Sequence, residues 1–514
     1  MSAEPTCEAA GAHWDLIVLG SDLEGLAAAA EGARLGLRTL LVGGDVLPGG
    51  TAREHTLAPG YVAAGLVDDT ETTARALLEP LGLEQSGLAW GPTPPRYGVS
   101  GAGTLARVDE DAEVARAFGA DNAARLGRWR RWLHRVGPAV LALWNAAPPE
   151  LVEPGADEAL RMAQRAFALR RLGKRDLYEL LHTAPQPAWD LAEERFDLGA
   201  FGAAWTAPAL LGLPHGPRAP GSAALVLLDG LLRGARPIGG PPALARALFG
   251  ALRRFGGGHR LGLAATRVLL AGGRVRGVAL SDGTELSARR VIATEGIARS
   301  LRQLFEPAEL PALLHDLAED WRTRGTVSVA RYAFERSPFT DLREPVRVVS
   351  APDLRTLEVS VDAHWNGELP AAPAIVFDLD PTGAPGGGAI VTAQVHGARR
   401  PAGGWNDARR AQLDRLVRAT LADTSGRSEE PVAAEILTPD ELEARYGLDG
   451  GHLGGGETSL DRLWLRRPHL AVCRYATPIP GFYLGGRAAH PGGPFRGGAG
   501  VLAARRAVRD ARGE

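Results

Sequence analysis

The stretch Asp15–Val42, DLIVLGSDLEGLAAAAEGARLGLRTLLV, decides the fold. Its apolar run Leu16–Leu19 predicts a buried strand, and a turn of small residues, Gly20–Gly25, follows directly. An Ala-rich segment to about Leu35 predicts a helix, and Thr39–Val42 predicts a second strand. This order is typical of the βαβ unit that opens a dinucleotide-binding domain, with the turn where a G-x-G-x-x-G fingerprint should lie.

The fingerprint in this turn is incomplete. Gly20 and Gly25 supply its first and third glycines, but Asp22 stands at the second position. The acidic residue expected at the end of the second strand, where it would bind a ribose hydroxyl, is replaced by Gly43. Asp22 has a further interpretation, since Asp commonly caps the N-terminus of the following helix. The sequence therefore predicts the frame of a cofactor site with two of its parts changed.

The amino-acid composition limits the classes of protein to which the chain can belong. With 514 residues, the chain is long enough for two domains or one large two-part enzyme. A hydrophobic fraction of 45% and a charged fraction of 23% are ordinary for a globular protein. The net charge of −2 argues against nucleic-acid binding, which normally shows an excess of basic residues.

The spacing of cysteines and histidines gives no support to a metal site. Cys7 and Cys473 lie far apart, and the 12 histidines show no H-x-x-x-H or H-E-x-x-H spacing. We expect a cytoplasmic protein, because the first residues, MSAEPTCEAAGAHW, are too polar for a signal peptide. The chain also contains no apolar run of about 18 residues that could span a membrane.

From about residue 92 to residue 230 the sequence favours helices. Apolar residues three and four apart predict an amphipathic helix, which Gly137–Pro138 should kink or break; they are Leu126, Trp129, Leu133, Val136, Val140 and Leu143. The opposite face carries arginines, namely Arg125, Arg128, Arg130, Arg131 and Arg135. Two interpretations stay open. A solvated charged face over a domain core is favoured by the neutral overall charge, and the other is peripheral contact with an anionic membrane surface.

The second half of the chain mixes strands and helices. Three short β runs between residues 264 and 294, divided by Gly-Gly and Asp-Gly turns, predict a β-meander that rejoins the first sheet. Residues 296–471 predict a sheet-containing domain, with strands at VSVARYAF, RTLEVSVDAHW and GAIVTAQVHG and helices near Ala308–Trp321 and Ala408–Asp423. The chain ends with a buried strand, Phe482–Leu484, a Gly/Pro-rich loop and a helix from about Gly500.

Five segments, taken in order, carry a resemblance to a known family. They are the opening βαβ unit, LPGGTA (Leu47–Ala52), PIGGPPALARAL, GGHLGGGETSLDRLWLRRP (Gly450–Pro468) and TPIPGFYLGGRAAHPGG (Thr477–Gly493). From about Trp14 to Val508, the chain resembles the phytoene dehydrogenase-like family of FAD-dependent oxidoreductases, which includes the carotenoid desaturases.

The resemblance implies an α/β fold with two intertwined domains. A Rossmann-like FAD-binding domain, made of a parallel sheet plus a β-meander, would comprise residues 13–91, 231–305 and 472–514. An inserted α+β substrate domain would comprise a helical part, residues 92–230, and a sheet-containing part, residues 306–471.

The resemblance also implies the residues that bind FAD. Those expected at the pyrophosphate or close to the cofactor are Gly20, Ser21, Gly25, Gly49 and Gly50. Val268 would offer its backbone to the adenine. Those expected by the ribityl chain and flavin ring are Gly486, His490, Gly492 and Gly493.

Three further residues have a weaker functional interpretation. His490 is the single candidate for a catalytic residue, and the alternative is that it only fixes the glycine loop. His452 and Glu457 could approach the substrate, although a structural strand-and-turn pair is favoured for them.

Departures from the family pattern concentrate at the pyrophosphate. Asp22 and Gly43 replace expected residues, and Arg487, Ala488 and Pro494 stand where the family prefers small residues or glycine. A carboxylate about 4 Å from a phosphate would cost roughly 4 kcal/mol at an effective dielectric near 20. Arg487 and Asp22 should face each other across this position. They could form an ion pair that fills the site, or Arg487 could neutralise Asp22 and itself bind the phosphates.

Two functions follow from these observations. The first is an FAD-dependent oxidoreductase that removes hydride from, or isomerises, a hydrophobic substrate, such as an isoprenoid or lipid-like molecule, held in the second domain. The alternative is a cofactor-free relative of the same fold, a binding or assembly protein in which Asp22 and Arg487 occupy the pyrophosphate site. The flavin content of the purified protein discriminates between them.

Overall fold

A computed structural model of the chain describes residues 13–100, 103–151, 154–398, 400–401, 403–493 and 496–513. Cys7, Pro494 and the polar N-terminal residues 1–12 lie outside the described residues. The predicted βαβ unit is present as β2 (Leu16–Leu19), α1 (Leu23–Arg34) and β3 (Thr39–Gly43).

β2 and β3 belong to a five-stranded sheet in which every pairing is parallel. Its order is β10 (Gly258–Leu261), β3, β2, β14 (Val291–Ala293) and β20 (Phe482–Leu484). Strands of a parallel sheet that is covered on both faces are expected to be continuously apolar, as LIVL in β2 is. The sheet gathers strands from three distant parts of the chain, and the predicted α/β fold class is confirmed.

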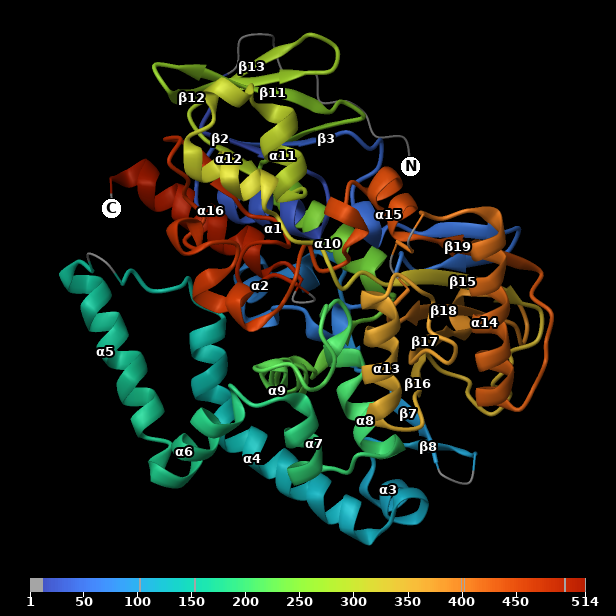
Figure 1. Ribbon diagram of the computed structural model, residues 1–514. Helices are drawn as coiled ribbons and strands as arrows, with labels where there is room; N and C mark the ends of the chain where they lie inside the picture. The colour runs from blue at the N-terminus through green and yellow to red at the C-terminus, as the bar shows by residue number, and fades with distance from the viewer. Residues whose placement is uncertain are drawn as a thin grey trace.

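Two layers cover the parallel sheet. α1, α10 (Gly240–Arg254) and α16 (Gly498–Arg512) pack on the face to which Leu16 and Val18 point. Ile17 and Leu19 point to the other face, which packs against α11 (Ile297–Leu304), α12 (Ala312–Glu319) and the predicted meander. The meander lies at the top of Figure 1 and consists of β11 (Ala265–Ala271), β12 (Arg274–Leu280) and β13 (Glu285–Ala288), joined by β1 (His13–Trp14).

A second, seven-stranded sheet lies to the right in Figure 1. Its order is β19 (Ala433–Leu437), β15 (Ser328–Phe334), β18 (Ala389–Val395), β17 (Ile375–Asp380), β16 (Val346–Ser350), β7 (Arg96–Val99) and β8 (Leu105–Arg107). α14 (Asp407–Ser425) packs on it through Leu413, Val417 and Leu421. β7 and β8 come from residues 92–230, so the helical structure predicted for that segment is wrong at its start. The domain boundaries themselves stay a prediction.

The amphipathic helix predicted around Leu126 is α4 (Ala120–Trp144). It continues through Gly137–Pro138, so the predicted break is wrong. The packing of its apolar stripe against α9 (Ser222–Leu232) outweighs the local cost of proline. Trp129 and Trp132 are fully buried in this core. The structure therefore agrees with a solvated charged face over a core, and α4 offers neither tryptophan to a membrane.

RTLEVSVDAHW forms a helix, α13 (Leu354–Trp365), and the predicted strand is wrong. The β-branched Val359 and Val361 favour a strand locally. However, Asp353 accepts a hydrogen bond from the backbone N–H of Thr356 (2.8 Å), as an N-cap does. Leu354 and Leu357, three residues apart, are both buried, which is the spacing of a helix face.

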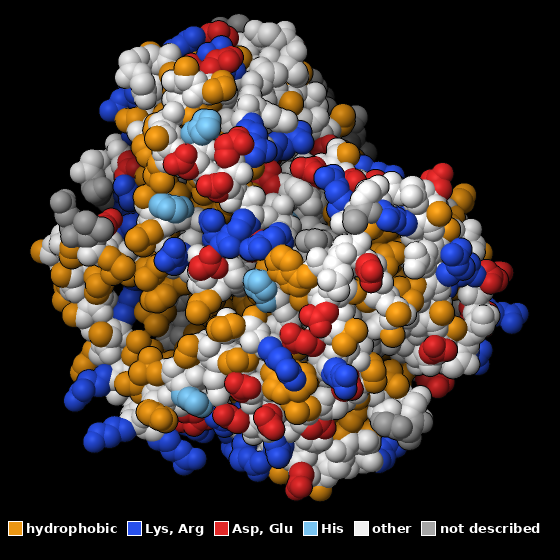
Figure 2. Space-filling model, in the orientation of Figure 1, with side chains coloured by type: hydrophobic (Ala, Val, Ile, Leu, Met, Phe, Trp, Pro, Cys, Tyr) orange, Lys and Arg blue, Asp and Glu red, His pale blue; other side chains and the backbone are white. Residues whose placement is uncertain are grey.

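The remaining elements are short. The helices are α2 (Arg75–Leu78), α3 (Asp111–Phe118), α5 (Ala156–Arg170), α6 (Gly173–Thr183), α7 (Ala188–Arg195), α8 (Ala200–Thr206) and α15 (Pro439–Tyr446). β4 (His55–Ala58) and β5 (Tyr61–Ala63) form a hairpin, and β6 (Trp90–Pro92) pairs antiparallel with the distant β9 (Ala235–Pro237). Among the described residues, no helix combines the length and apolar character needed to cross a bilayer. On the face drawn in Figure 2, acidic and basic side chains are interspersed over most of the surface.

Candidate functional site

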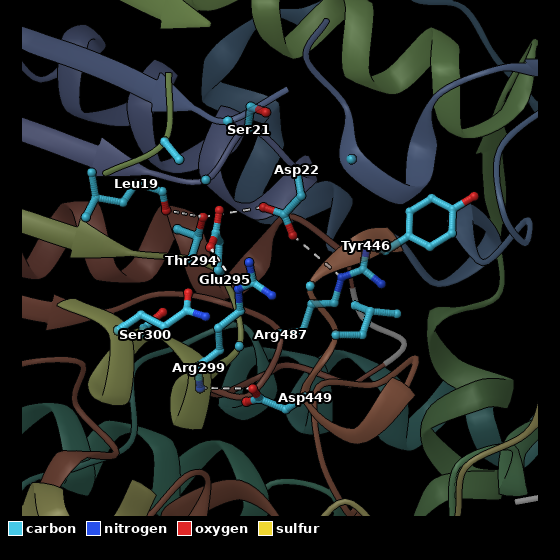
Figure 3. A pocket seen from close by; sticks show the side chains of 18 of the residues that line it. Leu19, Ser21, Asp22, Thr294, Glu295, Arg299, Ser300, Tyr446, Asp449 and Arg487 are labelled. Carbon is cyan, nitrogen blue, oxygen red and sulfur yellow. Dashed lines mark hydrogen bonds and ion pairs between the residues drawn. The ribbon is translucent and has the colours of Figure 1, made fainter. Parts of the chain in front are cut away.

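A cavity of about 240 Å³ lies at the carboxyl edge of the parallel sheet. We call it the sheet-edge cavity, and it is the position at which open α/β sheets bind ligands. Its walls come from the turn after β2, the loop after β3, the segment after β14, the start of α11 and the loop after α15. The lining residues on which its chemistry depends are Gly20, Ser21, Asp22, Asp45, Gly50, Thr294, Glu295, Arg299, Asp449 and Arg487 (Figure 3).

The first and third glycines of the fingerprint keep the turn close to its neighbours. A Cβ at Gly25 would lie 1.9 Å from the carbonyl oxygen of Gly20, and a Cβ at Gly20 would lie 2.4 Å from Oγ1 of Thr294. Gly20 also has a positive φ of 109°, which glycine adopts without strain. Both positions therefore require glycine for the packing of α1 against the strands, with or without a bound ligand.

Asp22, at the second position, is the N-cap of α1. Its Oδ1 accepts a hydrogen bond from the backbone N–H of Gly25 at 3.0 Å. On its other side the turn contacts the LPGGTA loop, because the N–H of Gly49 donates to the carbonyl of Ser21 at 2.6 Å. The carboxylate of Asp22 thus satisfies a helix N-terminus, which is also the place where a phosphate would bind.

Arg487 faces Asp22, as the sequence predicts. Its Nε lies 3.6 Å from Oδ2 of Asp22, and Figure 3 shows the two side chains directed toward one another. The guanidinium also donates to the carbonyl of Leu453 (3.1 Å) and to Oγ1 of Thr51. Burial lowers the pKa of Arg487, and the carboxylates of Asp22 and Glu24 act in the opposite direction. Arg487 therefore links the turn Gly20–Gly25, the LPGGTA loop and the Gly-rich segment after α15.

The glycine at the end of β3 is explained by its neighbour. A Cβ at Gly43 would lie 2.6 Å from Oγ of Ser21 and 3.2 Å from Leu261, so an acidic side chain has no room there. Two residues further on, Asp45 lines the same cavity and forms an ion pair with Arg53 at 3.2 Å. Asp45 is a candidate ribose ligand that the fingerprint spacing missed, because the carboxylate has moved beyond the strand end.

Glu24, in the first turn of α1, is a second carboxylate that caps a helix. It is fully buried and accepts hydrogen bonds from the backbone N–H groups of Gly497 (2.7 Å) and Gly500 (2.9 Å), at the N-terminus of α16. Burial, and then the charge of Asp22, raise the pKa of Glu24 to about 7. The N-termini of α1 and α16 are therefore both capped by carboxylates from one turn of the chain.

The remaining residues predicted to bind FAD do not line the sheet-edge cavity. Val268 lies inside the meander, paired with Val278, and the adjacent wall is made by Ala264 and Ala265 instead. Gly25 and Gly49 are not among the lining residues, and Gly486 passes close to the carbonyl of Thr294, where a Cβ would be 2.2 Å away. Gly492 and Gly493 lie in the loop before α16, away from the lining.

His490 does not line the sheet-edge cavity. It is fully buried, and its Nε2 lies 2.9 Å from the carbonyl oxygen of Trp144. Burial lowers its pKa to about 4, so that the ring is neutral at pH 7 and donates this hydrogen bond. This geometry agrees with the alternative in which His490 fixes the glycine loop.

His452 and Glu457 also make structural contacts. Nε2 of His452 lies 2.9 Å from the carbonyl of Gly212, while Glu457, fully buried, binds Arg324 through both carboxylate oxygens (2.6 and 3.1 Å). Arg467, which the sequence did not single out, donates to the carbonyls of Gly454, Glu457 and Arg487. It thereby joins the two Gly-rich segments that carried the family resemblance.

A second cavity, of about 80 Å³, lies on the other side of the Leu453 segment, and we call it the inner cavity. Its lining includes four carboxylates and two guanidinium groups: Asp68, Asp69, Glu71, Asp229, Arg347 and Arg496. Leu453 lines this cavity and accepts a hydrogen bond from Arg487, so Arg487 is part of the wall between the two cavities.

Ion pairs connect the charges around the inner cavity. The pairs are Asp68–Arg236, Asp69–Arg496, Glu71–Arg347, Glu71–Arg233, Glu71–Arg96, Asp229–Arg96 and Asp378–Arg347. Nearby arginines hold the pKa of Glu71 down at about 2, against the effect of burial. The charged part of this cavity's lining is therefore held in ion pairs, and the hydrophobic substrate stays a prediction.

The sheet-edge cavity has the donors that a dinucleotide phosphate requires. Arg487 carries five N–H donors and has three acceptors, and Nε of Arg299 has no hydrogen-bond partner among the described residues. The volume is below the roughly 300–1,000 Å³ of typical ligand pockets. The residues therefore fit the phosphates of FAD provided that the Asp22–Arg487 pair opens. Among the described residues, no group of three or more His, Cys, Asp or Glu side chains is placed to hold a metal ion.

Comparisons with known proteins agree with this architecture. No family model matches the chain. The pyridine nucleotide-disulfide oxidoreductase domain-containing protein 2 of Mus musculus is 27% identical over 97% of this chain and 94% of its own length, and that of Rattus norvegicus is 25% identical over the same shares.

Two solved structures illustrate the range of proteins with this fold. A putrescine oxidase redesigned for cofactor binding superimposes with a TM-score of 0.58 at 16% identity, covering 98% of this chain and 99% of its own. The Rab GDI of Plasmodium falciparum superimposes with a TM-score of 0.51 at 13% identity, covering 83% and 89%. At these identities the likeness shows the fold alone. The chain thus shares its fold with an oxidase and is similar in sequence to an oxidoreductase domain protein.

Proposed function

We propose that the chain is an FAD-dependent oxidoreductase related to the phytoene dehydrogenases, with its cofactor bound in the sheet-edge cavity. The observation that supports this most is Arg487, a buried guanidinium with N–H donors to spare beside the N-terminus of α1. An arginine with free N–H donors is a strong phosphate ligand. The similarity to an oxidoreductase domain protein over nearly the whole chain supports the reaction class.

When bound, FAD supplies the two-electron acceptor that the 20 amino-acid side chains lack. The chain contributes binding and orientation. Arg487 would exchange Asp22 for a phosphate oxygen, while Asp22 would keep its hydrogen bond to the N–H of Gly25. Asp45 would accept a hydrogen bond from a ribose hydroxyl, in place of the acid missing at Gly43.

Proton transfer in this proposal does not rest on histidine. None of the described residues that line either cavity is a histidine, and His490 is held neutral against the carbonyl of Trp144. In this proposal the inner cavity receives the reacting end of the substrate, and Arg487 connects it to the sheet-edge cavity through its hydrogen bond to the carbonyl of Leu453. Its charged walls favour a polar reacting end over a hydrocarbon.

The absorption spectrum of the purified protein tests the proposal. We expect flavin bands near a 1:1 ratio, or saturable uptake on adding FAD. Arg487→Ala should weaken FAD binding by about 10- to 150-fold, which corresponds to the roughly 1.5–3 kcal/mol of a charge-assisted hydrogen bond. Arg445→Ala is the matched control, because Arg445 lines the same cavity but is paired with Glu435 at 2.7 Å. A protein that stays colourless in excess FAD would contradict the proposal.

The Asp22–Arg487 pair also favours a second function, a cofactor-free binding or assembly protein. In that case the pair permanently replaces the pyrophosphate. The test is to restore the fingerprint with Asp22→Gly and Gly43→Glu, but Ser21 occupies the space that a residue at position 43 needs. Ser21→Gly must therefore be included. FAD binding by this triple variant, and none by the natural protein, would establish the second function.

A further inference from the structure

The charges around the inner cavity balance. The ion pairs described above join five carboxylates (Asp68, Asp69, Glu71, Asp229 and Asp378) to five guanidinium groups (Arg96, Arg233, Arg236, Arg347 and Arg496). Arg233 also lies 3.9 Å from Asp109, whose closer partner is Arg107 at 2.6 Å, so this extension of the set adds one charge of each sign. A ligand with a net charge would leave one charge uncompensated in a poorly solvated interior, which is strongly unfavourable. The cavity therefore disfavours ligands that carry a net charge.

One polar group in the cavity lacks a partner. Arg496 is only 2% exposed, and its Nε and Nη2 both bind Asp69, with Nε at 2.6 Å. Its Nη1 has no hydrogen-bond partner among the described residues, and the side chain lines the cavity. Burial lowers the pKa of Arg496 to about 10, so the group stays charged at pH 7 and Nη1 remains a donor. A buried donor of this kind requires an acceptor oxygen.

The rest of the wall limits the size of that acceptor. Val67, Leu225 and Val327 contribute apolar surface, and the volume of about 80 Å³ is well below the roughly 300–1,000 Å³ of typical ligand pockets. A carbonyl or amide group fits these limits, whereas a long acyl or isoprenoid chain does not.

We propose that the inner cavity binds a small polar group that has no net charge and carries a carbonyl or amide oxygen, which accepts a hydrogen bond from Nη1 of Arg496. As the substrate end of an oxidoreductase this assignment rests on the proposed function. The binding itself does not require FAD.

Three isosteric probes test the selection: acetamide is neutral, acetate is anionic and acetamidinium is cationic. Acetamide should raise the midpoint of thermal unfolding in a saturable manner, since a ligand that binds only the folded state stabilises it. Acetate and acetamidinium, compared at equal ionic strength, should bind at least about tenfold more weakly. Arg496→Lys keeps the charge beside Asp69, removes Nη1 and should abolish the acetamide effect. Arg474→Lys, at an arginine outside the cavity, should retain it.

Crystals of the natural protein soaked in acetamide provide a measurement that does not depend on the folding of a variant. We expect the acetamide oxygen within hydrogen-bond distance of Nη1 of Arg496. Equal stabilisation by a charged probe, persistence in Arg496→Lys, or no effect of any probe would overturn the proposal. Flavin content, measured on the same sample, separates the two failures: a colourless protein that binds acetamide loses the proposed function alone.

Discussion

The two cavities are lined by the same kinds of side chain but hold their charges differently. In the sheet-edge cavity Asp22 and Arg487 meet at 3.6 Å and Glu295 and Arg299 at 3.9 Å, and the Asp22 side chain remains 20% exposed. Around the inner cavity, Glu71 alone contacts three arginines, and its side chain is 5% exposed. A loose pair at an open edge can exchange a partner for a ligand, whereas a compact buried network is part of the fold. The first cavity is therefore suited to a charged cofactor and the second to an uncharged group.

The largest expected effect comes from breaking the buried network. Glu71→Ala leaves three guanidinium groups without a shared partner and should lower the free energy of unfolding by about 3–5 kcal/mol, measured by urea denaturation. Glu54→Ala is the control, because Glu54 forms an exposed pair with Arg246 and should cost at most about 1 kcal/mol. If the two variants are equally stable, the contrast drawn between buried and open pairs is wrong.

An intermediate effect is expected at Glu24, whose carboxylate interacts electrostatically with both Asp22 and Arg496. Its pKa rises from 4.5 in the unfolded chain to about 7 in the fold. A raised pKa stabilises the fold fully below pH 4.5, and this contribution is lost as the pH rises through 7. The loss amounts to roughly 3 kcal/mol over that window.

Glu24→Gln should therefore flatten the dependence of unfolding free energy on pH between about 4.5 and 7. Denaturation curves at several pH values measure it. Glu54→Gln, at the surface, should keep the slope of the natural protein. An unchanged slope in Glu24→Gln would show that another group titrates in this range.

The smallest effect is expected at Asp45, on the open side of the sheet-edge cavity, where its side chain is 44% exposed. Asp45→Asn should weaken FAD binding about tenfold, the value of one hydrogen bond to a carboxylate near solvent. FAD that lacks the adenosine 2′-hydroxyl should bind the natural protein and Asp45→Asn equally, as measured by calorimetry. Asp380→Asn, in the turn after β17, should leave both affinities unchanged. If Asp45→Asn and the loss of the 2′-hydroxyl weaken binding independently, so that their effects on the binding free energy add, the ribose contact is excluded.

Local signals in the sequence were sufficient to predict the core of the fold. The βαβ unit is readable because apolar runs and small residues follow one another within Asp15–Val42. The contact between Asp22 and Arg487 was predicted because the family resemblance aligned two segments that no local rule connects. By contrast, α13 was missed because β-branched residues outweighed the spacing of Leu354 and Leu357.

The features that depend on tertiary contacts could not be predicted from the sequence. Ser21 fills the space beside Gly43 only because β2 and β3 pair in a particular register, which the alternation of residue types does not specify. Glu71 and Arg347 are far apart in the chain, so no periodic pattern links them. One feature of the sequence could have indicated this buried ion pair. Arg347 interrupts the apolar strand VRVVS, and a charge at a buried strand position implies a buried partner.

The order of strands in the parallel sheet has a consequence for biosynthesis. β20, at the edge of that sheet, and α16, which covers it, come from the last part of the chain, whereas β2 comes from the beginning. While the ribosome is still adding these residues, β14 lacks one neighbour and α1 lacks the helix that packs on its alanines. Such long-range pairing is slow and exposes apolar surface. The first βαβ unit can therefore be enclosed only after β20 and α16 have been synthesised, and it needs protection from aggregation until then.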